Sequence, residues 1–406
     1  MIADLAALLA PVTPERFFAE HHDKAPLHVR GSPGKFAQVL SWRQINRLLD
    51  MTHIWSGTSL KLVIDSAAVP AEQYCTRAVS RDGASVLQPD AKMVQGWVAK
   101  GASVVMNDVD SLTPGLASIS AALEGAGLGK AQANVYISWQ SHKAFRTHYD
   151  THEVWAVQVE GEKDWNIWEG RGEWPIPHPI FRGQSQAHHD QARGTLREVV
   201  RMRPGDVLYL PRGWYHDALA EAPASVHVAY GVHAPLGMDL MNILAERVLY
   251  DPEFRKPLPR QDGSVPAKFA LTQRASLLGG RITELCRDPK VMEVLAQFVA
   301  NYRFSRGGFD MLAARGIAAP AGVSADEGGA MRVVAAGAKP VRRGAEWVVK
   351  GAGGTVVLSA PEAEAAAWLL ARPDVTASEL LAAHPGIDAG ALLARLGAAG
   401  LLVSSA

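Results

Sequence analysis

Two short segments near the middle of the chain carry side chains that could bind a metal ion. One is His148-Tyr149-Asp150, and the other is the run of residues 205–216, which ends in His216. Two imidazoles and one carboxylate form a ligand set that binds a metal on one face and leaves the opposite face open to other ligands. Because His148 and Asp150 lie two positions apart, they share one face of an extended strand. The sequence therefore predicts a facial metal site made by His148, Asp150 and His216.

The spacing within the second segment supports this prediction. Gly205, Pro211, Gly213 and His216 fit the pattern G-x5-P-x-G-x2-H, which resembles the second cupin motif. We expect a turn at Gly205, a strand across a barrel, and a second turn at Gly213 that directs His216 inward. A surface His-x-Asp pair and a structural hairpin are the simpler explanations of each segment alone. Their presence together, in this order, favours metal binding.

Other side chains near these segments keep some alternatives open. Four further histidines are possible ligands, namely His152, His188, His189 and His227. We expect exposed histidines in the polar stretch 170–194, which contains two of them, and we expect His227 to line the barrel interior. Two histidines and one carboxylate also serve hydrolytic zinc, for which Glu153 is the only sequence-adjacent general base.

The elements that must position the metal ligands are short strands. Runs rich in β-branched and aromatic residues, punctuated by Gly and Pro, occur at residues 134–139, 154–159, 164–168, 197–202, 207–210 and 225–230. This pattern predicts a small barrel or a double-sheet jelly roll. Residues 170–194, rich in Pro, His and Gln, separate the third and fourth of these strands. They are long for a structureless connection, so we expect either a functional lid or a disordered insertion.

The chain changes character after Pro235. Amphipathic helices are predicted at residues 240–249, 267–285 and 291–304, and residues 318–330 have the composition of a linker. The tail then predicts strands at 347–350 and 355–358 and helices at 363–370, 378–383 and 389–398. This order suggests a winged-helix module.

Composition limits the possible partners and the compartment. The 406 residues include 41 basic and 41 acidic side chains, so the chain as a whole is not attracted to nucleic acid or to an anionic membrane. Cys75 and Cys286 fit neither a disulfide framework nor a zinc knuckle. Residues 1–10 lack the basic start and the long apolar stretch expected of a signal peptide, and no run approaches the roughly 20 apolar residues needed to cross a bilayer. A cytoplasmic location is expected.

Residues 148–165 and 204–216 together resemble the JmjC-type ribosomal oxygenases, which are Fe(II)- and 2-oxoglutarate-dependent protein hydroxylases of the cupin superfamily. The resemblance implies an α+β fold: a double-stranded β-helix (cupin/JmjC jelly roll) followed by a helical dimerisation region and a C-terminal winged-helix domain. The implied boundaries are 1–236 for the catalytic domain with its N-terminal α/β elements, 237–317 for the dimerisation region, and 331–406 for the winged-helix-like domain.

The resemblance also implies roles for individual residues. His148, Asp150 and His216 would be the iron ligands, with 2-oxoglutarate and O₂ as cosubstrates. Lys163 lies 15 positions after His148, where the family places the basic residue that pairs with the distal carboxylate of 2-oxoglutarate. Asn134 and Tyr136 match cosubstrate-pocket residues of the family. From the residues alone, Lys163 could equally be a solvated turn lysine, and Asn134 and Tyr136 could be inward polar residues of a strand.

The implied substrate is a protein or peptide side chain, with a ribosomal protein as the first expectation and a dedicated precursor peptide as the second. A homodimer is implied through the helical region. The chain departs from the family at Asp164 and Asn166, where a basic residue is frequent. Residues 351–406 contain only Arg372 and Arg395 as Lys or Arg, so we expect no nucleic-acid binding by the winged helix.

Two other classes of function remain open at this point. One is a zinc-dependent cupin hydrolase or isomerase, and the other is a non-catalytic cupin that serves protein interaction. Lys163 and Tyr136 favour the oxygenase, because neither alternative needs an anion pocket at this distance from His148.

Overall fold

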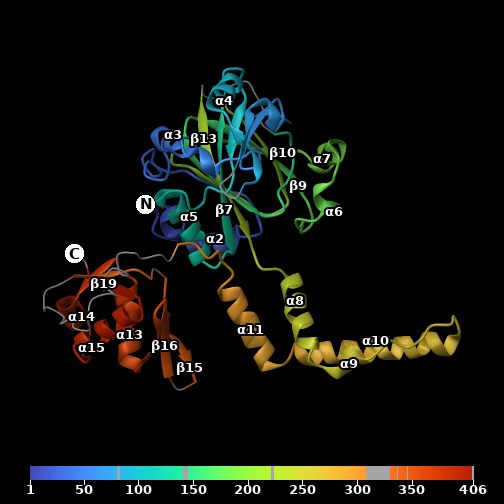
Figure 1. Ribbon diagram of the computed structural model, residues 1–406, viewed down its shortest axis with the longest axis vertical. Coiled ribbons are helices and arrows are strands. Elements are labelled where there is room, and N and C mark those ends of the chain that lie inside the picture. The colour runs from blue at the N-terminus through green and yellow to red at the C-terminus, as the bar shows by residue number, and fades with distance from the viewer. Residues whose placement is uncertain are drawn as a thin grey trace. The chain divides into compact units, whose positions relative to one another are not determined.

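The computed structural model describes residues 1–79, 83–139, 145–220, 224–307, 330–335, 337–344 and 346–404. The chain forms two compact units, residues 1–304 and residues 305–406 (Figure 1). The predicted division into three parts at 236, 317 and 331 stays a prediction. The expected linker, residues 318–330, lies outside the described residues except for its last position.

Two antiparallel sheets form the barrel of the first unit. The larger sheet has eight strands in the order β1-β11-β8-β13-β7-β6-β2-β3, and the smaller has three in the order β10-β9-β12. The strands of the larger sheet are, in that order, Leu27–Val29, Val207–Leu210, Glu153–Glu160, Ser225–His233, Lys130–Ser138, Ser103–Met106, Leu60–Ile64 and Ala67–Ala68. Those of the smaller sheet are Leu196–Met202, Lys163–Arg171 and Trp214–Ala220. All six strands predicted from the sequence are present.

The sheets face each other across a common apolar layer. Side chains from β8 and β11 in the larger sheet pack with side chains from β9, β10 and β12 in the smaller one. The layer includes Ala156, Leu208, Trp165, Val200 and Trp214. Residues at alternate positions of each strand point into this space because successive side chains of a strand point to opposite faces. The double-sheet jelly roll expected from the sequence is therefore the core of this unit.

A larger apolar core lies on the other face of the eight-stranded sheet. Trp155 and Tyr209 pack there with Phe17 from the N-terminal helices. The α-helices that precede β7 in the chain are α1 (Leu5–Leu9), α2 (Pro14–Glu20), α3 (Trp42–Leu49), α4 (Ala91–Val98) and α5 (Pro114–Gly125). The same part of the chain contains the 3₁₀ turns η1 (Thr52–Ile54) and η2 (Ala71–Gln73) and the hairpin of β4 (Cys75–Val79) and β5 (Ser85–Pro89). Thr13 and Thr113 each cap a helix that starts with proline, which fixes where α2 and α5 begin.

The stretch after β9 is folded and not structureless. It contains two short helices, α6 (Pro179–Arg182) and α7 (Gln186–Ala192), capped by His178 and Ser185. The disordered insertion that we considered for residues 170–194 is therefore wrong. The stretch is tied to the barrel strands at both ends, since Gly170 donates to Arg193 and Gly172 donates to Gly213 through backbone hydrogen bonds.

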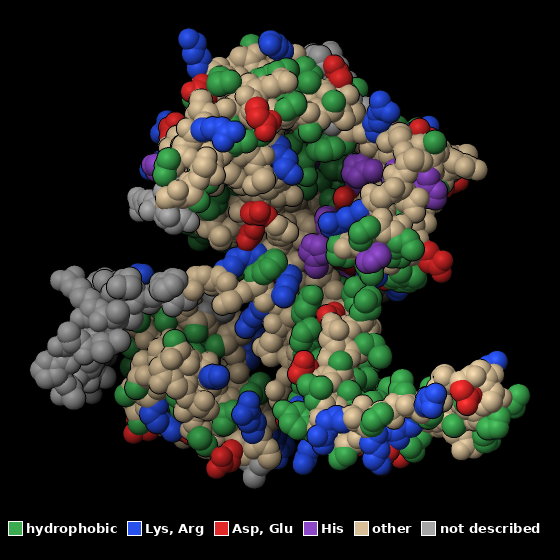
Figure 2. Space-filling view, turned by 45° about the vertical axis from the view of Figure 1, so that its right-hand side comes forward, with side chains coloured by type: hydrophobic (Ala, Val, Ile, Leu, Met, Phe, Trp, Pro, Cys, Tyr) green, Lys and Arg blue, Asp and Glu red, His purple; other side chains and the backbone are tan. Residues whose placement is uncertain are grey.

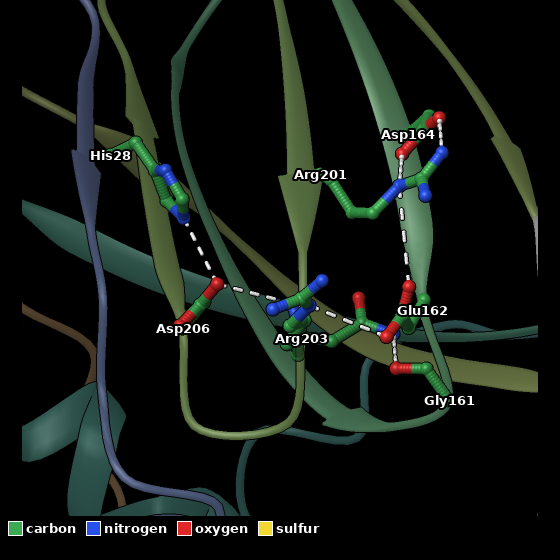
Figure 3. A network of polar contacts seen from close by, with 8 residues as sticks. His28, Gly161, Glu162, Asp164, Arg201, Arg203 and Asp206 are labelled. Atoms are coloured by element: carbon green, nitrogen blue, oxygen red, sulfur yellow. Dashed lines mark hydrogen bonds and ion pairs between the residues drawn. The ribbon is translucent and has the colours of Figure 1, made fainter.

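The turn that leads into the second motif is held by a chain of polar contacts (Figure 3). Asp206 accepts hydrogen bonds from the backbone of Gly31 and Arg203 and contacts His28 on β1 at 3.0 Å. Arg203 in turn lies 3.3 Å from Glu162. These contacts fix the β10–β11 turn before the strand that leads to His216.

The described helices between the barrel and residue 304 are α8 (Gly237–Val248), α9 (Pro252–Arg255), α10 (Val265–Leu285) and α11 (Pro289–Ala300). They match the helical section predicted after Pro235. The long helix α10 has no buried residue. No helix in the described parts of the chain is both long and apolar enough to cross a membrane.

The second unit has its own apolar core. Its strands are β14 (Ala330–Val333), β15 (Val341–Arg343), β16 (Glu346–Gly351), β17 (Gly354–Leu358), β18 (Asp374–Thr376) and β19 (Leu402–Ser404), and its α-helices include α13 (Ala360–Leu370), α14 (Ala377–Ala383) and α15 (Ala389–Ala398). The hairpin of β16 and β17 and the three helices appear where the sequence predicted them. Their order is compatible with a winged helix, which stays a prediction.

Candidate active site

The structure brings His148, Asp150 and His216 together at one edge of the barrel. Backbone hydrogen bonds in both directions pair His148 with His216, so the two motifs lie side by side. Gly213 has a positive φ of 85° and donates its N–H to the carbonyl of Asp150, which aligns the second turn with the first motif. One possible ligand atom from each of the three residues lies within 4.8 Å of the others.

The two imidazoles are oriented for coordination. The Nδ1 atom of His148 lies 2.8 Å from the carbonyl oxygen of Arg146, and the Nδ1 atom of His216 lies 2.9 Å from that of Trp214. A carbonyl can only accept, so each Nδ1 carries the proton and each Nε2 presents a lone pair. The Nε2 atom of His216 lies 3.5 Å from Oδ2 of Asp150. A backbone carbonyl behind each imidazole is the usual arrangement around a bound metal.

The electrostatics of the triad keep its donors in the metal-binding protonation state. Burial lowers the pKa of His216 to about 4, with His148 acting in the same direction. Burial raises the pKa of Asp150, but His152, His148, His216 and Arg182 outweigh it, so that the pKa of this carboxyl is lowered overall. At neutral pH the set is therefore one carboxylate and an uncharged His216 imidazole. This donor set suits Fe(II) and leaves positions free for other ligands.

Lys163 is buried inside the barrel and is not a solvated turn residue. It is the first residue of β9, only 3% exposed, and its Nζ lies 3.2 Å from Oγ of Ser138 and 3.4 Å from Nδ1 of His227. Among the described residues no carboxylate forms an ion pair with it. Burial lowers the pKa of Lys163 to about 7. A buried ammonium without an anion is costly, so this site fits a negatively charged ligand.

Tyr136 and Asn134 lie on the inward face of β7, beside the triad and the lysine. The Tyr136 ring stacks on His227 with centroids 4.8 Å apart, and its hydroxyl is hydrogen-bonded by the Asn134 side chain. Burial, together with the Asp150 charge, raises the pKa of Tyr136 to about 12. The phenol therefore stays protonated and can donate to an anion. His227 lines the interior, as we expected, and is not part of the triad.

Two small side chains face the barrel interior beside these residues. Ala218 on β12 and Ala229 on β13 lie in the middle of their strands, yet both are only partly buried. The metal-binding donors and the buried ammonium fit a small dianion such as 2-oxoglutarate, which would bind the metal with one end and Lys163 with the other.

Glu153 does not serve the triad. Its position on β8 is opposite in parity to the inward-facing Ala156, and its carboxylate lies 3.3 Å from His22 of the N-terminal section. His22 gains a raised pKa from this contact. The base that a zinc hydrolase would need from the adjacent sequence is therefore directed elsewhere.

The remaining candidate histidines contact neighbours other than the triad. His152 packs edge-on against His233, and His189 lies 3.2 Å from the hydroxyl of Tyr215 and packs against Tyr149. Histidine side chains gather on one side of the barrel in Figure 2. Because Tyr149 and Tyr215 are neighbours of the triad in sequence, α7 is fastened to the segments that carry the ligands.

Sequence reasoning missed three features of this site. Ser138 closes the lysine pocket, and Trp165 packs against both His216 and His227. Thr147 and Asp217, each next to a triad histidine, are joined by a hydrogen bond of 2.7 Å. Alternation along the strands could have found the first two, since Ser138 follows Tyr136 and Trp165 follows Lys163 at intervals of two. Nothing in the sequence pairs Thr147 with Asp217.

A pocket of about 210 Å³ lies along the segment that follows Asp150 in sequence. Thr151, His152 and Glu153 line it, and His233 and Arg212 are among its other lining residues. His148, Asp150 and His216 do not line this pocket.

Comparison with known proteins agrees with this geometry. The JmjC domain family matches residues 114–240, which contain the triad and Lys163. The bifunctional lysine-specific demethylase and histidyl-hydroxylase NO66 of Drosophila persimilis is 28% identical over 263 residues, covering 63% of this chain and 36% of that protein. The uncharacterized protein YxbC of Bacillus subtilis is 24% identical over 269 residues, covering 62% and 78%. This chain thus spans about a third of the length of the Drosophila relative.

The fold also matches a solved structure. YcfD, a ribosomal oxygenase from Escherichia coli in complex with cobalt and 2-oxoglutarate, aligns with a TM-score of 0.53 over 98% of this chain and 99% of that one. At 15% identity the likeness concerns the fold. The domain match, the relatives and the arrangement of triad and lysine agree with one another. Residues 114–240 match the JmjC domain family, and the chain resembles the JmjC-type ribosomal oxygenases in sequence and in fold.

Proposed function

We propose that this protein is an Fe(II)- and 2-oxoglutarate-dependent oxygenase that hydroxylates an amino-acid side chain of a protein or peptide. The observation that carries the proposal is the buried Lys163 ammonium, which faces the same interior as the triad and has no carboxylate partner among the described residues. Neither a zinc hydrolase nor a non-catalytic cupin needs such a cation.

In this proposal His148, Asp150 and His216 hold the iron on one face. When bound, Fe(II) and 2-oxoglutarate supply oxidative decarboxylation by O₂ to succinate and CO₂, coupled to conversion of a substrate C–H bond to C–OH. Lys163 binds the distal carboxylate of the cosubstrate, and Tyr136, held protonated, donates to it.

The Drosophila relative is named a demethylase and histidyl-hydroxylase, and YcfD is named a ribosomal oxygenase. These names support a protein substrate, with a ribosomal protein first and a dedicated precursor peptide second. The reaction takes place in the cytoplasm, where such a substrate is present.

The helices after the barrel are proposed to form a homodimer. The 21-residue helix α10 has no buried residue, and apolar side chains such as Val265, Phe269 and Leu277 are exposed along it. Exposed apolar surface of this kind favours burial against a second copy. The mass in solution tests this part, and a monomer at micromolar concentration would contradict it.

The second unit is proposed to be a winged helix that packs or docks peptides and does not bind nucleic acid. Its helices α13 to α15 contain only Arg395 as a basic residue, whereas a phosphate-binding helix needs several. A salt-dependent affinity of the full chain for duplex DNA, lost when residues 331–406 are removed, would contradict this.

The central test is turnover. Succinate formation from 2-oxoglutarate is measured with Fe(II), ascorbate and O₂, with and without candidate peptides, for the wild type and His148→Ala. We expect succinate in the wild type, more of it with a true substrate, and none in His148→Ala. Absence of succinate in the wild type under all these conditions, with tight zinc retention, would refute the proposal.

A further inference from the structure

Beyond the residues already assigned, we propose that Trp165 is a binding residue of the cosubstrate pocket, whose indole N–H donates a hydrogen bond to a carboxylate oxygen of bound 2-oxoglutarate. The inference rests on the proposed function, because it concerns the same pocket. It adds the uncharged indole N–H of Trp165 as a hydrogen-bond donor, located between the Lys163 ammonium and the triad.

Trp165 lies between the two ends of the proposed cosubstrate. It follows Lys163 by two positions on β9, so both side chains face the barrel interior. Across the ladder it pairs with Ala218, which is two residues from His216 on β12. The indole centroid lies 5.7 Å from that of His216 and 5.4 Å from that of His227. Trp165 therefore contacts a triad residue at one side and a neighbour of the Lys163 ammonium at the other.

The indole N–H has no acceptor in the described part of the chain. Trp165 is only 4% exposed, and its Nε1 finds no hydrogen-bond partner among the described residues. An indole nitrogen can only donate, so nothing but an acceptor can satisfy it. A buried donor without a partner is unfavourable, and native proteins retain few of them outside functional sites. The interior beside it contains mainly donors and apolar groups, whereas the carboxylates of 2-oxoglutarate offer acceptors only.

A second tryptophan provides the comparison that isolates this effect. Trp155 is fully buried and its Nε1 also lacks a partner. It packs between Phe17 and Tyr209 in the apolar core on the other face of the sheet, away from the triad and Lys163. The two indoles share burial and an unpartnered donor, but only Trp165 borders the half-buried alanines and the lysine. A change at Trp165 should therefore affect ligand binding, and the same change at Trp155 should affect only stability.

The test is a calorimetric titration of 2-oxoglutarate into the full chain loaded with Mn(II), without O₂, for the wild type, Trp165→Phe and Trp155→Phe. Phenylalanine keeps an aromatic ring and removes the donor. We expect Trp165→Phe to bind about tenfold more weakly, equivalent to about 1.4 kcal/mol. Trp155→Phe should bind within twofold of the wild type, and Mn(II) retention should be the same in all three.

A spectroscopic measurement keeps the inference testable if Trp165→Phe does not fold. In protein labelled with ¹⁵N-tryptophan and loaded with Zn(II), one of the 11 indole N–H signals should shift downfield when 2-oxoglutarate is added, and its exchange with solvent should slow. That signal should persist in Trp155→Phe, and its proton should show nuclear Overhauser contacts to the ring of His216 or His227, which lie next to Trp165.

The outcomes separate this inference from the proposed function. If the wild type does not bind 2-oxoglutarate with any of these metals, the proposed function fails. If the wild type binds it, but Trp165→Phe binds equally well or no indole signal moves, the cosubstrate pocket stands and the role of Trp165 is refuted.

Discussion

The two faces of strand β9 differ in how their polar groups are satisfied. On the outward face, Asp164 pairs with Arg201 through two contacts of 2.7 Å, and Asn166 donates to Asp217 at 2.9 Å. On the inward face, the hydrogen-bond partners of Lys163 among the described residues are a hydroxyl and an imidazole, and Trp165 has no acceptor among them. The outward polar groups form hydrogen bonds and ion pairs with one another, which stabilises the sheet. The inward groups lack such partners in the described part of the chain, as expected of residues that bind a ligand.

The largest effect should follow from removing a triad ligand. Asp150→Ala leaves two imidazoles and no charge to offset a dication, so we expect loss of stoichiometric Fe(II) or Mn(II) binding. Metal content after gel filtration measures this, with Asp164→Ala as the control of equal charge change on the outward face. Full metal content in Asp150→Ala would contradict the assignment of His148, Asp150 and His216 as the metal ligands.

A large effect on stability, but not on the pocket, is expected at the outward carboxylate Asp217. It accepts hydrogen bonds from Thr147, Asn166 and Trp168 and is almost fully buried. Asp217→Asn places a donor where acceptors are needed, at a cost of about 2 kcal/mol of folding free energy. Denaturant unfolding measures the loss. If Asp217→Asn lost more than tenfold in 2-oxoglutarate affinity without being destabilised, the claim that outward polar groups support stability and inward ones bind the ligand would be contradicted.

The pH dependence of cosubstrate binding should reveal the inward lysine. Burial lowers the pKa of Lys163 to about 7, against 10.5 for an unperturbed lysine. Lys163 of the folded protein without cosubstrate thus loses its proton as the pH rises through about 7. In the unfolded chain this side chain stays protonated until about pH 10. Above pH 7 the folded protein therefore no longer buries a charged ammonium at this position. A bound dianion restores the proton. At pH 8 binding should take up about one proton, and affinity should fall up to about tenfold per pH unit.

Calorimetry in buffers with different ionisation enthalpies counts these protons. The same experiment with Lys163→Met should show no uptake that changes between pH 6 and 9. If Lys163→Met took up the same number of protons on binding 2-oxoglutarate as the wild type, the proton would belong to a group other than Lys163.

The smallest effect is expected at Asp164. Its pair with Arg201 is half-exposed on the arginine side, and such pairs contribute less than about 1 kcal/mol. Asp164→Asn should therefore leave metal content and 2-oxoglutarate affinity unchanged. A marked loss of either would mean that the acidic residue at this position, unusual for the family, belongs to the substrate entrance.

The sequence could predict the strands and the triad because each depends on local spacing. His148 and Asp150 share a face by alternation, and residues 205–216 contain both turns that direct His216 inward. The resemblance to a known family, and not spacing alone, pointed to Lys163. Its burial could not be predicted, because the preceding Gly161-Glu162 predicts an exposed turn and the lysine is covered by Ser138 and His227 from distant strands.

Other features depend on contacts between segments far apart in sequence. The two helices in residues 170–194 have only four and seven residues, and they are stable because they dock on the barrel, for example through His189 on Tyr215. The unpartnered state of Trp165 depends on every neighbour in the barrel interior. Such facts need the folded chain.

One equilibrium measurement tests the central claim, that Lys163 is unpaired because it binds the distal carboxylate of 2-oxoglutarate. It compares the affinities of 2-oxoglutarate and pyruvate, which lacks that carboxylate, for Mn(II)-loaded wild type and Lys163→Met at pH 6.5 without O₂. We predict that the wild type prefers 2-oxoglutarate by about 100-fold, since a charged hydrogen bond contributes up to about 3 kcal/mol, and that Lys163→Met binds both acids about equally. An undiminished preference in Lys163→Met would contradict the account.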